Sequence, residues 1–215
     1  MKTTLLLIRH GESQANLEKK FAGHWDIPLT QRGLKQAELT ANYIAKTYKV
    51  DKIFSSDLSR AFDTAKALSA LTGIDVIKEE DFREIKAGEW EKRTFDELAR
   101  DYPETYLNVW KNDIGKAICD GGESVADVGN RVYNKLLEIV KENEGKTIAI
   151  ATHATPIRTA LCIMECKNVC EASKFVWASN ASVTDVSFSN TKWESVDFSH
   201  DSHLESEKTV LPPNV

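Results

Sequence analysis

The sequence has few features typical of exported, membrane-bound or metal-binding proteins. The apolar stretch Leu5–Ile8 is closed by Arg9 and is far shorter than the core of a signal peptide. Three of the four cysteines, Cys162, Cys166 and Cys170, stand at steps of four residues, a spacing typical of neither zinc sites nor disulfide frameworks. We therefore expect a cytoplasmic protein with free thiols, no bound metal and no membrane partner.

Clusters of basic residues are also missing. The chain carries 28 Lys and Arg against 33 Asp and Glu, a formal net charge of −5, with no run of like positive charge. A nucleic-acid-binding protein normally presents a basic stripe, so nucleic acid is not an expected partner. An anionic ligand would have to be held by a local pocket. At 215 residues with 41% hydrophobic residues, the composition is that of one soluble domain, residues 1–215.

Alternating strand and helix patterns predict an α/β fold. The expected strands cover residues 3–8, 52–55, 74–77 and 147–152. The expected helices cover residues 31–48, with Thr30 as N-cap, 58–71 and 124–140, with another beginning at Pro156. Residues 182–188 and 192–198 alternate apolar and polar around a short turn, which predicts an antiparallel hairpin. The result is a three-layer sandwich with a mostly parallel central sheet. We expect its edge hairpin to pair in a homodimer or to be capped by the polar tail.

The stretch 81–124 interrupts this rhythm. It contains several tryptophans and turn signals, and Thr94 with Glu97 forms a capping box at the start of one short helix. We predict a small helical lid, inserted into the domain and laid over one end of the sheet. His24, Trp25, Lys86, Trp90 and Trp110 are candidates to face the leaving group of a substrate from this end.

Chemically distinctive side chains follow the predicted strands. They are Arg9 and His10 after the first strand, Arg60 after the second, Glu84 after the third, and His153 after the fourth. In open parallel sheets, ligands bind beyond the carboxyl ends of the strands. Two arginines and two histidines gathered there would form a cationic pocket suited to a dianionic phosphate, without magnesium.

Two local patterns add backbone donors to this pocket. Gly11–Asn16 predicts a loop that cradles phosphate, and Thr155-Pro156 is typical of a helix N-terminus, whose free N–H groups point at a bound oxyanion. An unprotonated imidazole of His10 would serve as the nucleophile, and Glu84 as the proton donor. Taken singly, each residue is more often a cap, a core side chain or a surface charge; their joint occurrence at strand exits favours function.

One segment resembles a known signature. Leu7–Asn16, which reads LIRHGESQAN, resembles the signature of the histidine phosphatase superfamily, also called the phosphoglycerate mutase-like family. Further matching features are Ser55–Ala61, Glu84 four residues before Gly88, Gly121–Ser124 and Thr152-His153, so that the resemblance extends from Thr3 to about Asp197.

The resemblance implies a phosphohistidine mechanism. His10 would take the phosphoryl group, Arg9, Arg60 and His153 would hold its oxygens, and Glu84 would protonate the leaving alcohol and then activate water. The residues expected to bind the substrate are Asn16, Ala22, Gly23 and Ala154. Ala154 is a departure, because the family usually has glycine there and a positive φ would cost alanine more.

Within the superfamily, the choice lies between phosphatase and mutase. The mutases carry a longer, arginine-rich insertion, whereas residues 85–119 hold only Arg93 and Arg100. The pattern is nearest to the short bacterial phosphatases of the α-ribazole phosphatase type. We therefore expect a metal-independent phosphomonoesterase that needs no cofactor and hydrolyses a small phosphate ester. A cofactor-dependent phosphoglycerate mutase and a non-catalytic phosphate-ligand sensor are the alternatives.

Overall fold

A computed structural model describes residues 1–209 of the chain, apart from the side chains of residues 195 and 196. Six strands form one sheet in the order β3-β2-β4-β1-β5-β6. The strands are β1 (Thr3–Arg9), β2 (Lys52–Ser55), β3 (Val76–Lys78), β4 (Thr147–Thr152), β5 (Val183–Ser189) and β6 (Lys192–His200). The first four are parallel to one another, whereas β5 is antiparallel to β1 and β6 is antiparallel to β5 at one edge. The predicted fold class is confirmed.

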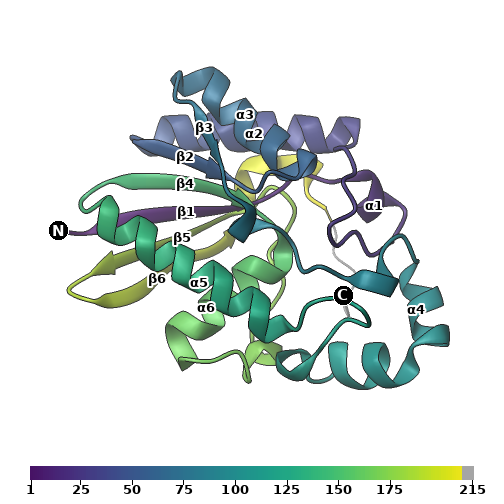
Figure 1. Cartoon of the computed structure of the whole chain (residues 1–215). Coiled ribbons are helices and arrows are strands. Elements are labelled where there is room, and N and C mark those ends of the chain that lie inside the picture. The colour runs from purple at the N-terminus through teal and green to yellow at the C-terminus, as the bar shows by residue number, and fades with distance from the viewer. Residues whose placement is uncertain (210–215) are drawn as a thin grey trace.

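Helices cover both faces of this sheet (Figure 1). Helices α2 (Gln31–Thr47) and α3 (Ser59–Thr72) pack on one face, and α5 (Val125–Glu142) and α6 (Ala154–Cys166) on the other. The central strand β1 is buried on both sides, since Leu5 and Leu7 belong to one hydrophobic cluster while Leu6 and Ile8 belong to the second. This explains why its sequence is continuously apolar instead of alternating.

Local capping explains where most helices begin and end. Thr30 accepts a hydrogen bond from the Gly33 N–H at the start of α2, and Gly73 ends α3 with a φ of 72°. The prediction for α6 was wrong by two residues, because this helix begins at Ala154 with His153 as its N-cap. Pro156 is tolerated at its third position, since the first N–H groups of a helix have no intrahelical partner.

Short helices and turns make up residues 81–124, at the end of the sheet where the parallel strands finish (Figure 1). They comprise α4 (Phe95–Asp101), a π-helix (Pro103–Trp110) and 3₁₀ turns (Glu80–Phe82, Gly88–Trp90, Ile114–Lys116). Thr94 and Glu97 form the expected capping box of α4. The buried side chains of this segment share one hydrophobic cluster with β1 and α5. Its role as a separate lid stays a prediction.

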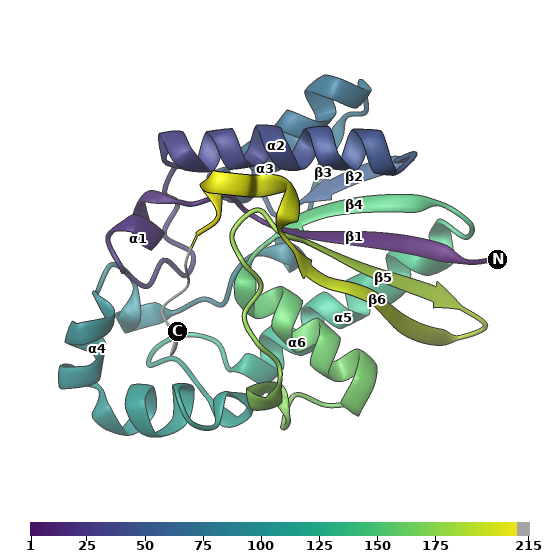
Figure 2. The ribbon, with the colours of Figure 1, turned by 180° about the vertical axis from the view of Figure 1, so that it is seen from behind.

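The described part of the C-terminal tail, residues 201–209, packs against α2, as Figure 2 shows. A 3₁₀ segment, Ser202–Glu207, lies along that helix, and the His203 ring stacks on Tyr43 with a centroid distance of 4.7 Å. The tail therefore covers a helix and not the free edge of β6, and a homodimer through that edge stays a prediction. In the part of the chain that the structure describes, no helix is both long and apolar enough to span a membrane.

Candidate functional site

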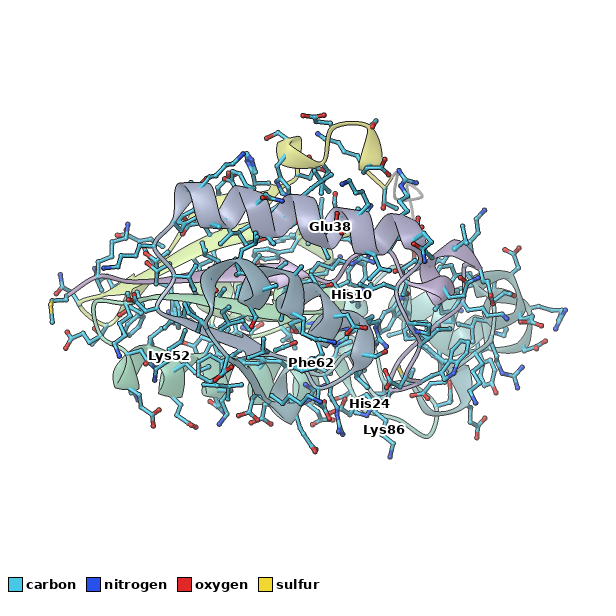
Figure 3. All side chains as sticks on the ribbon, turned by 90° about the horizontal axis from the view of Figure 1, so that it is seen from above. His10, His24, Glu38, Lys52, Phe62 and Lys86 are labelled. Atoms are coloured by element: carbon cyan, nitrogen blue, oxygen red, sulfur yellow. The ribbon has the colours of Figure 1, made fainter. Side chains whose placement is uncertain are left out.

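A pocket opens where the parallel strands end. Figure 3 shows His10 and His24 toward this end of the molecule, far from Lys52 at the start of β2. The pocket is lined by Arg9, His10, Ser13, Asn16, Lys20, Phe21, Ala22, Gly23, Arg60, Glu84, Phe95, Tyr106, Trp110, Ala154, Thr155 and Trp177. All of the predicted site residues line it except His153, which lies directly behind His10.

The imidazole of His10 is held in one tautomer. Its Nδ1 lies 2.7 Å from the carbonyl oxygen of Gly11, so Nδ1 carries the proton and Nε2 keeps a free lone pair. Burial lowers the pKa of His10 well below 6.5, and the charges of Arg60 and Arg9 lower it further. A neutral imidazole with a free Nε2 is the form that a nucleophile requires.

His153 is fixed behind the nucleophile by two contacts. Arg60 Nε donates a hydrogen bond to His153 Nδ1 over 3.2 Å, and His153 Nε2 lies 2.9 Å from Ser56 Oγ. The two histidine rings meet edge to face, with centroids 5.1 Å apart. Burial and then the charge of Arg60 lower the pKa of His153 well below 6.5, so this ring is also neutral at pH 7.

Two buried arginines supply the positive charge of the pocket. Burial lowers the pKa of both Arg9 and Arg60 to about 10, so that both stay protonated at neutral pH. Arg60 donates to the carbonyl oxygens of Gly23 and Trp25. Arg9 Nη1 donates to the Ala178 carbonyl, while Arg9 Nε is buried without a partner among the described residues. Such a concentration of desolvated donors suits a doubly charged phosphoryl group.

Glu84 reaches the pocket from the loop after β3. Its Oε1 accepts a hydrogen bond from the Ile85 N–H at 2.9 Å, and its Oε2 accepts one from the Thr155 N–H at 3.4 Å. Thr155 lies in the first turn of α6, where free N–H groups and the helix dipole favour a negative charge. The sequence predicted that this helix N-terminus faces an oxyanion, and in the structure it donates a hydrogen bond to the Glu84 carboxylate.

The predicted substrate-binding residues surround the phosphate end. Asn16 Oδ1 accepts a hydrogen bond from the Ser13 N–H at 3.0 Å and a second one from the Asn180 side chain. Both bonds hold the loop Gly11–Asn16 closed. Gly23 has a φ of 53°, and an added Cβ would lie 2.5 Å from Glu91 Oε1, so only glycine fits. Ala154 does not have the positive φ that the resemblance suggested, because it is the first residue of a helix.

Five aromatic side chains line the pocket together with these polar residues. Its walls include Phe21, Phe95, Tyr106, Trp110 and Trp177. The rings of Trp110 and Trp177 stack at 6.2 Å, and the Arg158 guanidinium lies 4.2 Å above Trp177. Apart from Trp110, these wall residues were missed by sequence reasoning, because they come from separate segments whose meeting depends on tertiary packing.

The other leaving-group candidates have different roles. Trp90 is fully buried and packs on Phe21, and Lys86 is exposed. His24 Nε2 hydrogen-bonds to the Glu84 carbonyl oxygen at 2.8 Å, so His24 contacts the backbone of the proposed proton donor. Lys20 was also missed; its Nζ lies 2.7 Å from Glu18 at the pocket entrance. Within residues 1–209, no group of three His, Cys, Asp or Glu side chains is placed to hold a metal ion.

Comparisons with known proteins match this arrangement. The family model described as "Histidine phosphatase superfamily (branch 1)" matches residues 5–201. The chain is 35% identical over 160 residues to phosphoserine phosphatase 1 of Hydrogenobacter thermophilus, covering 74% of this chain and 75% of that protein. It is 30% identical over 205 residues to the metal-independent phosphoserine phosphatase of Arabidopsis thaliana, covering 95% and 84%.

A solved structure shows the same fold. Bacillus stearothermophilus YhfR superposes with a TM-score of 0.88 at 28% identity, covering 94% of this chain and 100% of that one. The likeness therefore includes the sheet, both helical layers and the segment over the strand ends.

Proposed function

Because this chain belongs to the histidine phosphatase superfamily, we propose that it hydrolyses a phosphate monoester through a phosphoryl group carried on Nε2 of His10. The predicted superfamily and the predicted phosphomonoesterase class are confirmed by the two phosphoserine phosphatases. One observation carries the proposed mechanism: the bond from His10 Nδ1 to Gly11 leaves Nε2 unprotonated in the pocket.

The first half-reaction transfers the phosphoryl group. The dianion binds beside Arg9 and Arg60, whose positive charges offset its own, while His153 holds Arg60 from behind the pocket. The Nε2 lone pair attacks phosphorus and the bond to the leaving oxygen breaks. Glu84 donates a proton to that oxygen, the alcohol departs, and the carboxylate that forms is held by the N–H groups of Ile85 and Thr155.

The second half-reaction returns the enzyme to its starting state. Glu84, now a carboxylate, takes a proton from water, and the resulting hydroxide attacks phosphorus. The N–P bond breaks, inorganic phosphate leaves, and Nε2 regains its lone pair. One water molecule is consumed for each ester cleaved.

The composition of the pocket lining favours hydrolysis over mutase activity. A mutase must hold a bisphosphate, which needs several cations beyond the transferred group. Among the described lining residues, Lys20 is the cation besides Arg9 and Arg60, and it is paired with Glu18. The aromatic walls suit a small leaving alcohol with at most one further negative charge. The serine of phosphoserine, the substrate named for two relatives, meets this description.

The mechanism is tested by trapping the intermediate. Wild-type protein mixed with ³²P-labelled phosphoserine in EDTA and then denatured should carry an acid-labile, base-stable label. His10→Ala should lose the label and reduce kcat roughly 10³-fold or more. His200→Ala, which changes a histidine outside the pocket, should keep both. Undiminished label in His10→Ala would exclude His10 as the nucleophile, and turnover that disappears in EDTA would exclude metal independence.

A further inference from the structure

The geometry points to Arg131 and Glu123 as the residues that position Glu84 for proton transfer. This inference rests on the proposed function, in which Glu84 is the proton donor. Arg131 lies on α5, and Glu123 precedes that helix in the Gly121–Ser124 motif. Neither residue lines the pocket, so both would act through Glu84 without touching the substrate.

Every N–H donor of Arg131 is directed at the loop that carries Glu84 or at Glu123. Its Nη1 donates to the carbonyl oxygens of Asp81 at 2.7 Å and Arg83 at 2.8 Å. Its Nη2 donates to the carbonyl oxygen of Glu84 at 2.9 Å. The Arg131 side chain is only 18% exposed. One guanidinium on a long helix therefore binds three carbonyls leading up to the proposed acid.

Glu123 completes the attachment from the other side of Glu84. It pairs with Arg131 Nε at 2.9 Å and Nη2 at 3.0 Å, and its Oε2 also accepts the Lys86 N–H at 2.7 Å. The Glu123 N–H in turn donates to the Lys86 carbonyl oxygen at 2.8 Å. At Gly122, an added Cβ would lie 2.1 Å from that same oxygen, so glycine is needed for this approach.

Besides the Arg131–Glu123 pair, the loop is held by the Arg83–Asp57 ion pair and by the hydrogen bond from His24 to the Glu84 carbonyl oxygen. Residues 83–87 lie between two 3₁₀ turns and belong to no helix or strand. The carboxylate itself is held by two backbone N–H groups, one of them at 3.4 Å. Glu84 must meet first the leaving oxygen and then a water at hydrogen-bond distance, and an error of about 1 Å costs such a step roughly 10² in rate. The Arg131–Glu123 pair fixes the loop on both sides of Glu84.

Leaving-group dependence separates positioning from mere fold stabilisation. A misplaced acid slows the release of a basic alkoxide, while 4-nitrophenolate departs without a proton. We therefore compare the single-turnover phosphorylation of His10 by phosphoserine and by 4-nitrophenyl phosphate. In Arg131→Met and Glu123→Gln, the rate with phosphoserine should fall roughly 30- to 100-fold, and the rate with 4-nitrophenyl phosphate by less than about threefold.

Lys135→Met is the matched control. Lys135 lies on the same helix and pairs with Glu79 at 3.3 Å and Glu138 at 3.0 Å, so the variant removes a cation near this loop without touching residues 83–86. It should leave both phosphorylation rates unchanged. Arg131→Lys, which keeps the charge but lacks the fork of donors, should behave like Arg131→Met, and it gives the same test if Arg131→Met does not fold.

A double-mutant cycle completes the test. If Arg131 acts through Glu84, adding Arg131→Met to Glu84→Gln should slow phosphorylation by less than about twofold. A further large loss, or equal losses with both substrates in the single variants, would overturn the inference. Failure of the proposed function gives another result, because Glu84→Gln would then change the phosphorylation rates with phosphoserine and with 4-nitrophenyl phosphate by the same factor.

Discussion

Arg60 and His153 form a buried hydrogen bond in which the arginine Nε donates to the histidine Nδ1 over 3.2 Å. An acceptor at Nδ1 means that a neutral His153 carries its proton on Nε2, toward Ser56. Arg60 thus fixes the tautomer of His153 while its other nitrogens hold the loop at Gly23 and Trp25. The phosphate site is therefore built before any ligand arrives.

The two buried histidines should make stability depend on pH. The pKa values of His10 and His153 are lowered well below 6.5, so below pH 6.5 the unfolded chain binds protons that the folded protein does not. The free energy of unfolding should then fall with decreasing pH, by about 1.4 kcal/mol per pH unit for each ring. His153→Gln should lose about that much of the slope between pH 6.5 and 5.5.

Urea unfolding at several pH values measures this slope. Gln14→Leu is the control, because it removes an exposed contact to Glu18 and changes no histidine, so it should keep the wild-type slope. A slope in His153→Gln equal to that of the wild type would show that His153 is protonated in the folded protein.

Arg60→Lys should damage the phosphate site although the charge is kept. A lysine cannot donate to His153, Gly23 and Trp25 together, as the guanidinium does. We expect kcat/KM for phosphoserine to fall roughly 10²- to 10³-fold, and vanadate inhibition to weaken at least about tenfold. Arg93→Lys, at a 40% exposed position, should change neither value more than about twofold. Wild-type vanadate affinity in Arg60→Lys would contradict the role of its fork of donors.

Most of the phosphate end of the site could be predicted from the sequence, because each residue there follows a strand. Arg9, Arg60 and Glu84 line the pocket for the geometric reason that parallel strands finish at one edge of the sheet. The backbone of Ala154 could not be predicted, since it depends on α6 beginning at that residue and not at Pro156. Because the family usually has glycine at this position, the resemblance suggested backbone strain at Ala154. In the structure, Ala154 lies in a helical turn.

The aromatic walls and the hydrogen bonds that hold the Glu84 loop could not be predicted from the sequence, for a different reason. Tyr106 lies in a π-helix and Trp177 in an irregular segment after α6, and no periodic pattern places them opposite each other. In the sequence, Arg131 is an ordinary charged residue of an amphipathic helix. Its function follows only from the three carbonyls that it meets in the folded chain.

Trp177→Leu should weaken the binding of the leaving group and not that of the phosphate. Trp177 forms one wall of the pocket, between Trp110 and Arg158. Loss of one aromatic contact of about 1–1.5 kcal/mol predicts a roughly tenfold rise in KM for 4-nitrophenyl phosphate. Inhibition by inorganic phosphate should change by less than about twofold. Trp193→Leu, on the edge strand β6, serves as the control, and equal effects on ester and phosphate would contradict this assignment.

Gln36→Leu should loosen the connection between the C-terminal tail and the phosphate loop. Gln36 is fully buried; its Oε1 accepts the Glu12 N–H at 2.7 Å, and its Nε2 donates to the Glu207 carbonyl oxygen at 2.6 Å. Leucine would leave the buried Glu12 N–H and the Glu207 carbonyl without this partner, which costs about 1–3 kcal/mol for each group that stays dry. Because Glu12 follows His10 and Gly11 in the loop, the loss should appear both as a lower urea midpoint and as a higher KM for phosphoserine. Gln14→Leu, which removes an exposed contact to Glu18, should change neither. If Gln36→Leu matched the wild type in both measurements, the tail would have no part in holding the loop.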